Sequence, residues 1–421
     1  MQASNEVSDL VDHFFRNEFG KAVAVLTNKY GSDMLELAED AVQEALYKAM
    51  QTWPFQALPD NPTGWIIRVA NNKILDHLRR KDKVTYQDQV PELNEEELNP
   101  TEEEFKDDMV KMMFACCNPK LSSEYQLILT LKILGGLSIK EMASALLKKE
   151  ETIAKSYTRA KKKFREENLK LELPKNKEIN TRLGHVLKVI YLLFNEGYKS
   201  TNHDQLIRKD LCLDAIRLCQ LLEENETTNT AATRSLLALM CFHSSRFDAR
   251  QDEDGKIVPL ENQDRTKWTH EFIDRGNAYL SSVSDEHSQN EYFLQAAISG
   301  IHCNAKHFNE TRWDIILHLY DQLLNINPNP IIALNRLVTY EKVYGAEKAL
   351  VELKTIESEP SLQRNYLLPA IKSELLASMK MYTEAKAQLE QAIELTANPS
   401  EKEFLKVKLI TFDKHNLTKT Q

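Results

Sequence analysis

The chain has 421 residues and a formal net charge of −9, from 63 acidic and 54 basic side chains. This length predicts about two to four domains. Glycine is scarce, at 11 residues, and neither a G-x-G-x-x-G sequence nor a P-loop sequence occurs, which argues against a nucleotide-binding fold of either kind. Few Gly and Pro among many Leu, Ala, Glu and Lys predict an all-α protein.

The N-terminus and the cysteines indicate the cellular compartment in which the protein is expected. The first ten residues include Glu6 and Asp9 and no apolar core, so we expect no signal peptide. No apolar run approaches the roughly 18 residues of a membrane span. The six cysteines contain no C-x-x-C spacing, and we expect reduced thiols in a cytoplasmic protein.

A first amphipathic helix is predicted over residues 35–50, where apolar side chains recur with a period of 3.6 residues. Asp40, Gln43 and Glu44 fall outside that apolar stripe. A loop with three prolines follows over residues 53–64. These polar side chains are therefore expected on the exposed side of the helix.

A second helix is predicted over residues 62–81. Asn61 followed by Pro62 is typical of a helix start, because Asn caps free N–H groups and Pro suits the first helical position. Apolar contacts recur along one side, while Asn72 and several basic residues step along another. Residues 65–83 carry a net charge of +4.

The stretch from 86 to 108 is strongly acidic, with ten acidic residues and one Lys. Few apolar residues and two prolines indicate a solvated linker. Stretched at about 3.3 Å per residue it reaches about 75 Å.

A helix-turn-helix is predicted over residues 122–165. A helix over residues 123–134 ends at two glycines, and Ser138 with Glu141 forms a capping box that opens the next helix. A last helix begins near Glu150, with one apolar stripe made up of Ile153, Tyr157, Ala160 and Phe164. Its remaining surface is basic and suited to a DNA major groove, although a solvated basic helix has the same pattern.

The C-terminal region, from about residue 183 to 420, is predicted to be a succession of helices. Near its end, residues 333–350 recur approximately at 370–386, an offset of about 37 residues. Two helices per unit of this length resemble a tetratricopeptide repeat, whose concave face binds peptides or proteins.

No catalytic or metal-binding constellation is predicted. His302, Cys303 and His307 lack a fourth ligand at a recognisable spacing. The segment 252–255 resembles part of a calcium loop but lacks the bidentate Glu that closes it, so a turn is expected. We therefore expect no enzyme activity, no cofactor and no metal.

The order of these parts resembles the extracytoplasmic-function sigma factors, minimal members of the sigma-70 family of bacterial RNA polymerase. The motifs are residues 38–46, residues 65–72 and 76–80, the acidic linker and the helix-turn-helix. Segments such as 191–198 and 261–265 resemble the C-terminal extension of one subgroup, which carries tetratricopeptide-like helices. The implied domains are a region 2 domain over 8–85, the linker over 86–108, a region 4 domain over 109–168 and a helical domain over 183–420.

The resemblance implies a role for each matching position. Docking on core polymerase is implied for Asp40, Gln43 and Glu44. Contact with the −10 promoter element is implied for Trp65, Arg68, Asn72, Lys73, Asp76, Arg79 and Arg80, with Asn72 holding an unstacked base. Contact with the −35 element is implied for Thr152, Lys155, Ser156, Arg159, Lys162 and Lys163. The turn at residues 147–150 departs from relatives that carry a Gly and a capping Ser or Thr.

The sequence therefore predicts a factor that binds core polymerase and promoter DNA, with a C-terminal domain that regulates it in cis and has a protein or peptide partner. Two alternatives stay open at this stage. One is a helix-turn-helix regulator that binds an operator without polymerase, and the other is a tetratricopeptide adaptor. The exposed face that contains Asp40 argues against the first alternative, because a protein that binds an operator without polymerase does not need a surface for polymerase.

Overall fold

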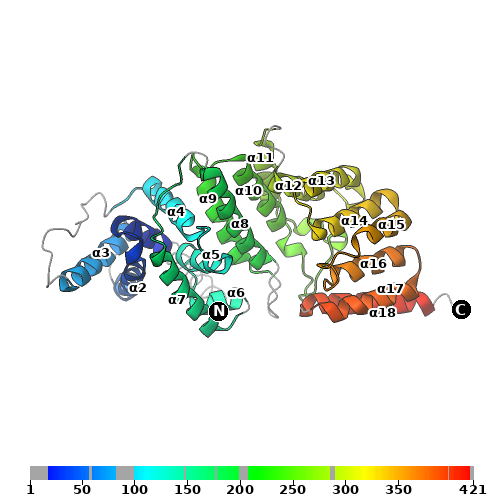
Figure 1. Ribbon diagram of the computed structural model, residues 1–421, viewed down its shortest axis with the longest axis horizontal. Coiled ribbons are helices and arrows are strands. Elements are labelled where there is room, and N and C mark those ends of the chain that lie inside the picture. Colours follow the sequence, from blue (N-terminus) through cyan, green and yellow to red (C-terminus); the bar gives the residue numbers. More distant parts are fainter. Residues whose placement is uncertain are drawn as a thin grey trace. The chain divides into compact units, whose positions relative to one another are not determined.

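The computed structural model describes residues 18–55, 59–81, 99–146, 148–175, 178–198, 207–284, 290–396 and 398–417. Helices joined by turns make up these ranges, and the β structure within them is one isolated bridge between Gln251 and Ile257 (Figure 1). The prediction of an all-α protein is confirmed. Parts of the predicted region 2 domain and linker, at 8–17 and 86–98, and Leu147 of the predicted turn lie outside the described residues.

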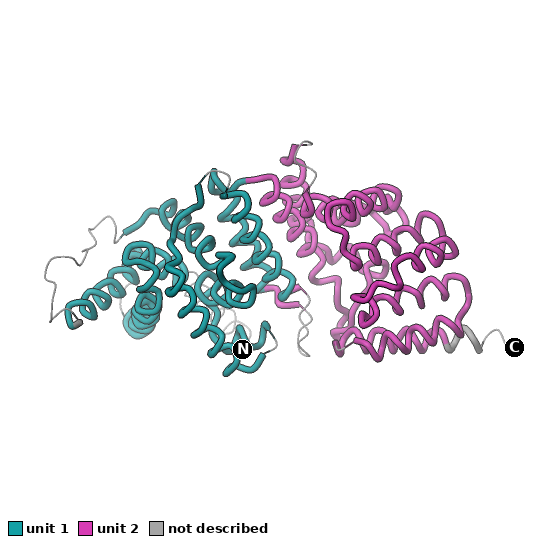
Figure 2. Tube along the Cα trace, in the orientation of Figure 1, with its two compact units in different colours: residues 1–197, 210–229 teal, residues 198–209, 230–421 magenta. Residues whose placement is uncertain are grey.

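The chain divides into two compact units (Figure 2). Unit 1 holds residues 1–197 and 210–229, and unit 2 holds residues 198–209 and 230–421. Among the described helices, none is both long and apolar enough to cross a bilayer.

Unit 1 begins with a helix over residues 18–30 and continues through a 3₁₀ turn, Ser32–Met34, into α2, Leu35–Thr52. Of the predicted apolar stripe of α2, the residues Leu35, Ala38, Val42, Ala45 and Ala49 are buried, while Leu46 is half-buried. Most of these side chains are small, and Ala41 beside them is also buried. After a 3₁₀ turn, Trp53–Phe55, comes α3, Pro62–Lys81, which packs along α2. Small residues on α2 allow that close approach, and each helix keeps its other side exposed.

The start of α3 confirms the predicted cap. The Asn61 Oδ1 atom accepts a hydrogen bond from the backbone N–H of Gly64 at 2.9 Å, which satisfies one of the free donors of the first turn. In the same turn Thr63 is hydrogen-bonded to Glu18 of the first helix. The first turn of α3 is therefore held both by its own cap and by a residue of the first helix.

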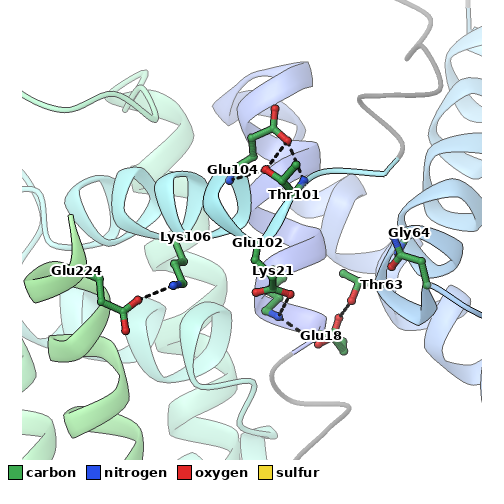
Figure 3. A network of polar contacts seen from close by, with 10 residues as sticks. Glu18, Lys21, Thr63, Gly64, Thr101, Glu102, Glu104, Lys106 and Glu224 are labelled. Atoms are coloured by element: carbon green, nitrogen blue, oxygen red, sulfur yellow. Dashed lines mark hydrogen bonds and ion pairs between the residues drawn. The ribbon is translucent and has the colours of Figure 1, made fainter. Parts of the chain in front are cut away.

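The prediction of a linker up to residue 108 is wrong for its last part, because α4, Glu102–Cys116, begins inside it. Thr101 and Glu104 form a capping box, and three glutamates occupy the first turn, where the helix dipole favours negative charge. The carboxylate of Glu102 pairs with Lys21, and Lys106 pairs with Glu224 at 2.8 Å (Figure 3). The acidic residues that suggested a solvated chain thus start a helix.

The predicted helix-turn-helix is confirmed. It consists of α5, Ser123–Leu129, a π-helical turn, Thr130–Leu134, then α6, Ile139–Ala145, and α7, Glu150–Glu166. The capping box of Ser138 and Glu141 is present, and the four residues of the predicted apolar stripe of α7 are all buried. The first helix differs slightly from its prediction, because it widens where the N–H of Gly135 donates to the Thr130 carbonyl at 3.0 Å.

Two helices of the C-terminal region pack within unit 1. They are α8, Glu178–Tyr198, and α9, Lys209–Glu224. Arg182 of α8 donates to the Phe114 carbonyl at 2.7 Å, and Arg217 of α9 donates to the Leu134 carbonyl at 3.0 Å. Both arginines therefore satisfy carbonyl groups near the ends of helices in the predicted region 4.

Unit 2 opens with a cluster of four helices, α10, Ala231–Ser244, α11, His270–Ser281, α12, Glu291–Asn304, and α13, Trp313–Ile326. The Phe242 ring lies at the centre of α10, α11 and α12. A Cβ atom at Gly276 would lie 2.7 Å from this ring, and one at Gly300 would lie 3.0 Å from it. Glycine at both positions lets the helices close around the ring.

The end of unit 2 contains two helix pairs and a final helix. The pairs are α14, Pro330–Tyr344, with α15, Ala346–Ile356, and α16, Leu367–Ser378, with α17, Tyr382–Leu395, followed by α18, Pro399–Leu417. Successive helices pack on one another in chain order. This placement agrees with the repeat seen in the sequence, while its assignment to the tetratricopeptide class stays a prediction.

Candidate nucleic-acid interface

The exposed side of α2 carries the three residues predicted to bind polymerase. Asp40, Gln43 and Glu44 are all exposed, opposite the buried alanine stripe. Tyr47, at 61% exposure, continues the same side one turn further on, and it was missed by the sequence reasoning. Its position seven residues after Asp40 was the available signal. We call Asp40, Gln43, Glu44 and Tyr47 the docking face.

The exposed side of α3 carries most of the residues predicted to contact the −10 element. Those that are exposed are Arg68, Asn72, Asp76, Arg79 and Arg80. Asn72 lies one turn from Arg68 and one turn from Asp76, so the amide is flanked along the helix by a guanidinium and a carboxylate. An exposed amide that can donate and accept suits the edge of an unpaired base.

Two of the predicted −10 residues are half-buried rather than exposed. Trp65 packs edge-on against Trp53 of the preceding turn, with 5.4 Å between ring centroids. Lys73 forms an ion pair with Glu44 of the docking face. The aromatic pair connects the turn at residues 53–55 to α3, and the ion pair connects the two predicted binding faces.

Asn71, the residue before Asn72, has a different environment. It is 2% exposed, and its Oδ1 atom accepts a hydrogen bond from the Tyr30 hydroxyl at 2.6 Å. The two adjacent asparagines therefore differ in role: Asn71 is buried and hydrogen-bonded within the fold, whereas Asn72 is exposed.

The outer side of α7 carries the predicted −35 residues. Thr152, Lys155, Arg159 and Lys162 are exposed, while Ser156 and Lys163 are half-buried. Three of the lysines pair with acidic residues four positions away, Lys155 with Glu151 at 2.6 Å, Lys162 with Glu166 at 3.7 Å and Lys163 with Glu167 at 2.6 Å. DNA phosphates would have to displace these carboxylates, which costs little because such surface pairs are weak.

In the turn that departs from the family pattern, Lys148 is bound by a side chain of α5. The Lys148 ammonium binds Glu124 of α5 at 2.7 Å, and the Ser156 hydroxyl donates to the same carboxylate oxygen at 3.3 Å. The hydrogen bond from Lys148 lowers the pKa of Glu124. Glu124 thus connects both the turn and α7 to α5, a role that was not predicted from the sequence.

A buried carboxylate on α2 was also missed. Glu39 is 3% exposed and accepts hydrogen bonds from the Tyr157 hydroxyl at 2.7 Å and the Lys161 ammonium at 3.2 Å. These partners belong to α7, more than one hundred residues further along the chain. The inner side of α7 thus contacts the helix that carries the docking face.

The segments considered for metal binding lack a metal site. Burial lowers the pKa of His302 to about 4, and the Cys303 thiol is buried against Ser245. Asp252 accepts hydrogen bonds from the N–H groups of Asp254 and Lys256 at 3.0 and 2.8 Å, as in a turn. Within the described ranges, no three His, Cys, Asp or Glu side chains are grouped as metal ligands.

Comparisons with known proteins agree with this arrangement. Residues 17–84 match the family model described as Sigma-70 region 2, and residues 111–164 match Sigma-70, region 4. Residues 182–284 match a family of unknown function, DUF6596. An uncharacterised protein of Rhizobium meliloti (strain 1021) is 32% identical over 382 residues, which cover 89% of this chain and 90% of that protein.

Proposed function

Because the chain belongs to the sigma-70 family, as a sigma factor that recognises promoters, we propose that it is of the extracytoplasmic-function type and acts in the cytoplasm. In this proposal α2 docks on core polymerase, α3 opens and holds the −10 element, and α7 reads the −35 element. The observation that carries it is that three helices in this order each bury one side and expose a polar side of fitting chemistry.

Capture of a base explains the chemistry of α3. A base leaves the stack only if a protein pocket replaces its stacking and hydrogen bonds. The Asn72 amide supplies donors and an acceptor, and Trp65, two turns earlier on the same helix, supplies an aromatic ring. Arg68, Arg79 and Arg80, exposed on the same helix, supply phosphate contacts that keep the opened strand in place.

Recognition of the −35 element rests on α7. Its basic outer side enters the major groove, where Arg159 and the exposed lysines reach phosphates and guanine edges. The net charge of −9 on the whole chain opposes free binding to DNA, so we expect promoter binding only when polymerase holds the factor.

The test of the function uses the full chain with core RNA polymerase from a bacterium. We expect the two to co-elute on gel filtration, and the complex to start transcripts at discrete sites on a genomic library template. Mapping transcript starts then identifies the promoter elements. Absence of both the complex and the discrete starts contradicts the function.

We further propose that the C-terminal region regulates this activity in cis and holds a protein or peptide partner. Support comes from a groove of about 420 Å³ within unit 2, lined by α14, α16 and α18. Asn335 and Phe404 line it, together with Lys408, which is ion-paired with Glu374. Polar and aromatic side chains along every second helix of this end of unit 2 suit an extended peptide.

A truncation separates regulation from folding, and its position follows from unit 1. A chain that ends at Asn229 keeps α8 and α9, and we expect it to fold and to bind core polymerase. A chain that ends at Asn180 leaves the carbonyls of Phe114 and Leu134 without Arg182 and Arg217 and exposes the apolar surface under two helices. We expect its melting temperature, measured by circular dichroism, to be at least about 10 °C lower.

The longer truncation then reports on regulation. We expect promoter-specific transcription by the chain that ends at Asn229 to differ at least about three-fold from that of the full chain. Equal transcription at equal polymerase occupancy contradicts a regulatory role for unit 2.

A further inference from the structure

The groove within unit 2 is longer than the cavity of about 420 Å³ described above. Two further cavities, of about 470 and 430 Å³, adjoin it and share part of its lining. The ring of Phe404 on α18 lines all three, and Asn335 of α14 and Ile371 of α16 each line two of them. One continuous groove therefore runs over α14, α16 and α18, and we call it the unit 2 groove.

A loop over residues 250–262 forms the opposite wall of the unit 2 groove. Ile257 and Pro259 of this loop each line two of the cavities. The loop is held in place from behind, because the amide of buried Gln263 donates a hydrogen bond to the Val258 carbonyl at 3.0 Å. A wall that is formed before a partner binds lowers the entropic cost of binding an extended chain.

The unpaired charges of the unit 2 groove are negative. Each lysine that lines it has an acidic partner, in the pairs Lys256 with Asp254 at 3.4 Å, Lys342 with Glu341 at 3.0 Å and Lys408 with Glu374. Glu261 and Glu403, in contrast, line the groove, are exposed and form no ion pair within the described residues. Uncompensated carboxylates of this kind attract a basic partner and repel nucleic acid.

Apolar and amide groups lie between these carboxylates. Phe404 and Ile371 are half-buried, so each keeps part of its apolar surface open to the groove. The Asn335 amide is exposed, and within the described part of the chain it has no hydrogen-bond partner. A side-chain amide both donates and accepts, as a backbone peptide group does, so Asn335 suits the backbone of an extended chain.

Lys408 occupies the position that a cation of a bound partner would take. Its ammonium lies 6.0 Å from the centre of the Phe404 ring and pairs with Glu374, which lines the groove from α16. Burial lowers the pKa of Lys408, so the charged lysine is held there at a cost. A basic side chain of a partner can replace it on Glu374, because the flexible stem of Lys408 can carry its ammonium into solvent.

We propose that the partner of the unit 2 groove is an extended peptide in which basic side chains flank an apolar one. Phe404 contacts the apolar side chain. The basic side chains bind the carboxylates that line the groove, Glu261, Glu374 and Glu403. This inference deepens the proposed function, because it rests on a peptide partner for unit 2 and adds the chemistry of that partner. The stretch at 86–98 of this chain does not fit the groove, because it is itself acidic.

The test measures binding of synthetic peptides to the full chain by fluorescence anisotropy, without polymerase or DNA. Three labelled heptapeptide pools are compared, with random ends and a fixed centre of Lys-Leu-Lys, Gln-Leu-Gln or Glu-Leu-Glu. We expect the Lys-Leu-Lys pool to bind at least about ten-fold more tightly than the Gln-Leu-Gln pool, and the Glu-Leu-Glu pool to bind most weakly. Added salt should reduce this preference, because it screens the charges.

The two members of one ion pair should change the affinity in opposite directions. Glu374→Gln removes a carboxylate, so we expect the Lys-Leu-Lys pool to bind about five-fold more weakly. Lys408→Met leaves Glu374 free and keeps an apolar stem beside Phe404, so we expect about three-fold tighter binding. Glu347→Gln, on the exposed side of α15 and outside the groove, is the matched control and should keep the wild-type affinity.

Asn335→Ala separates backbone contacts from charge. The side chain is exposed, so the fold tolerates its loss. Because it is expected to contact the peptide backbone, the variant should weaken binding of all three pools by a similar factor, about three-fold or more, and should leave their order unchanged. Unchanged affinities in this variant contradict the contact of Asn335 with the peptide.

Each of the other outcomes is equally definite. Equal binding of the three pools, or tightest binding of the acidic pool, overturns the basic character of the partner while a peptide partner stands. No binding of any pool contradicts the peptide partner itself. Unchanged affinity in both Glu374→Gln and Lys408→Met, with normal circular dichroism spectra, also overturns the inference, as does a dimer on gel filtration that Glu374→Gln dissociates. Regulation is decided separately, by transcription with the chain that ends at Asn229.

Discussion

We expect Asp40→Arg to weaken the association with core polymerase about thirty-fold or more without unfolding the protein. Asp40 is exposed near the middle of α2, away from the buried alanine stripe, so the fold tolerates a long cation there. The docking face instead changes from acidic to mixed charge, which opposes a basic partner surface. Reversal of a charge within an interface costs about 2 kcal/mol or more, which corresponds to about thirty-fold weaker binding. Fluorescence anisotropy of labelled factor titrated with core polymerase measures the change.

The control for this variant is Glu390→Arg. Glu390 is an exposed carboxylate in the middle of α17, so its reversal changes the net charge of the protein by the same amount. We expect wild-type affinity for core polymerase from this control. Equal losses in both variants would mean that overall charge, rather than the docking face, governs binding. Wild-type affinity of Asp40→Arg would remove α2 as the docking site.

The helices of unit 1 could largely be predicted because their signals are local. Asn61 and Pro62 mark the start of α3, and Ser138 with Glu141 marks the start of α6, since caps depend on residues within one turn. The start of α4 carried the same signal in Thr101 and Glu104. It was misread because a high density of carboxylates was taken as evidence of solvated chain, although a helix N-terminus stabilises negative charge.

The candidate interface, too, could be predicted in part. Helical period alone predicts which side of α2, α3 and α7 is buried, and exposure of the polar residues on the other side follows from it. The hydrogen bond between Tyr157 and Glu39 could not be predicted, because Tyr157 fits the apolar stripe of α7 and only the folded chain brings its hydroxyl to Glu39. Asn71 and Asn72 are adjacent and identical in the sequence, and only tertiary packing shows that Asn71 is the buried one.

Asn72→Ala leaves polymerase binding intact and blocks opening of the promoter. The side chain is exposed on α3, so its loss removes no packing, and the ion pair of the neighbouring Lys73 with Glu44 of the docking face is kept. An amide that pairs with a base edge contributes about 1–3 kcal/mol, so we expect about ten-fold to one-hundred-fold fewer open complexes. Permanganate reactivity of unpaired thymines at the −10 element, at saturating polymerase, measures this directly.

Asn71→Ala is the matched control, because it deletes the same side chain one position earlier. It removes the hydrogen bond from Tyr30 to a buried amide, so we expect a loss of about 1–3 kcal/mol in the free energy of unfolding and little change in open complexes below the melting temperature. A promoter with an unpaired −10 element already has the cost of opening removed, so Asn72→Ala should recover part of its activity there. Full opening of an intact promoter by Asn72→Ala would contradict base capture by α3.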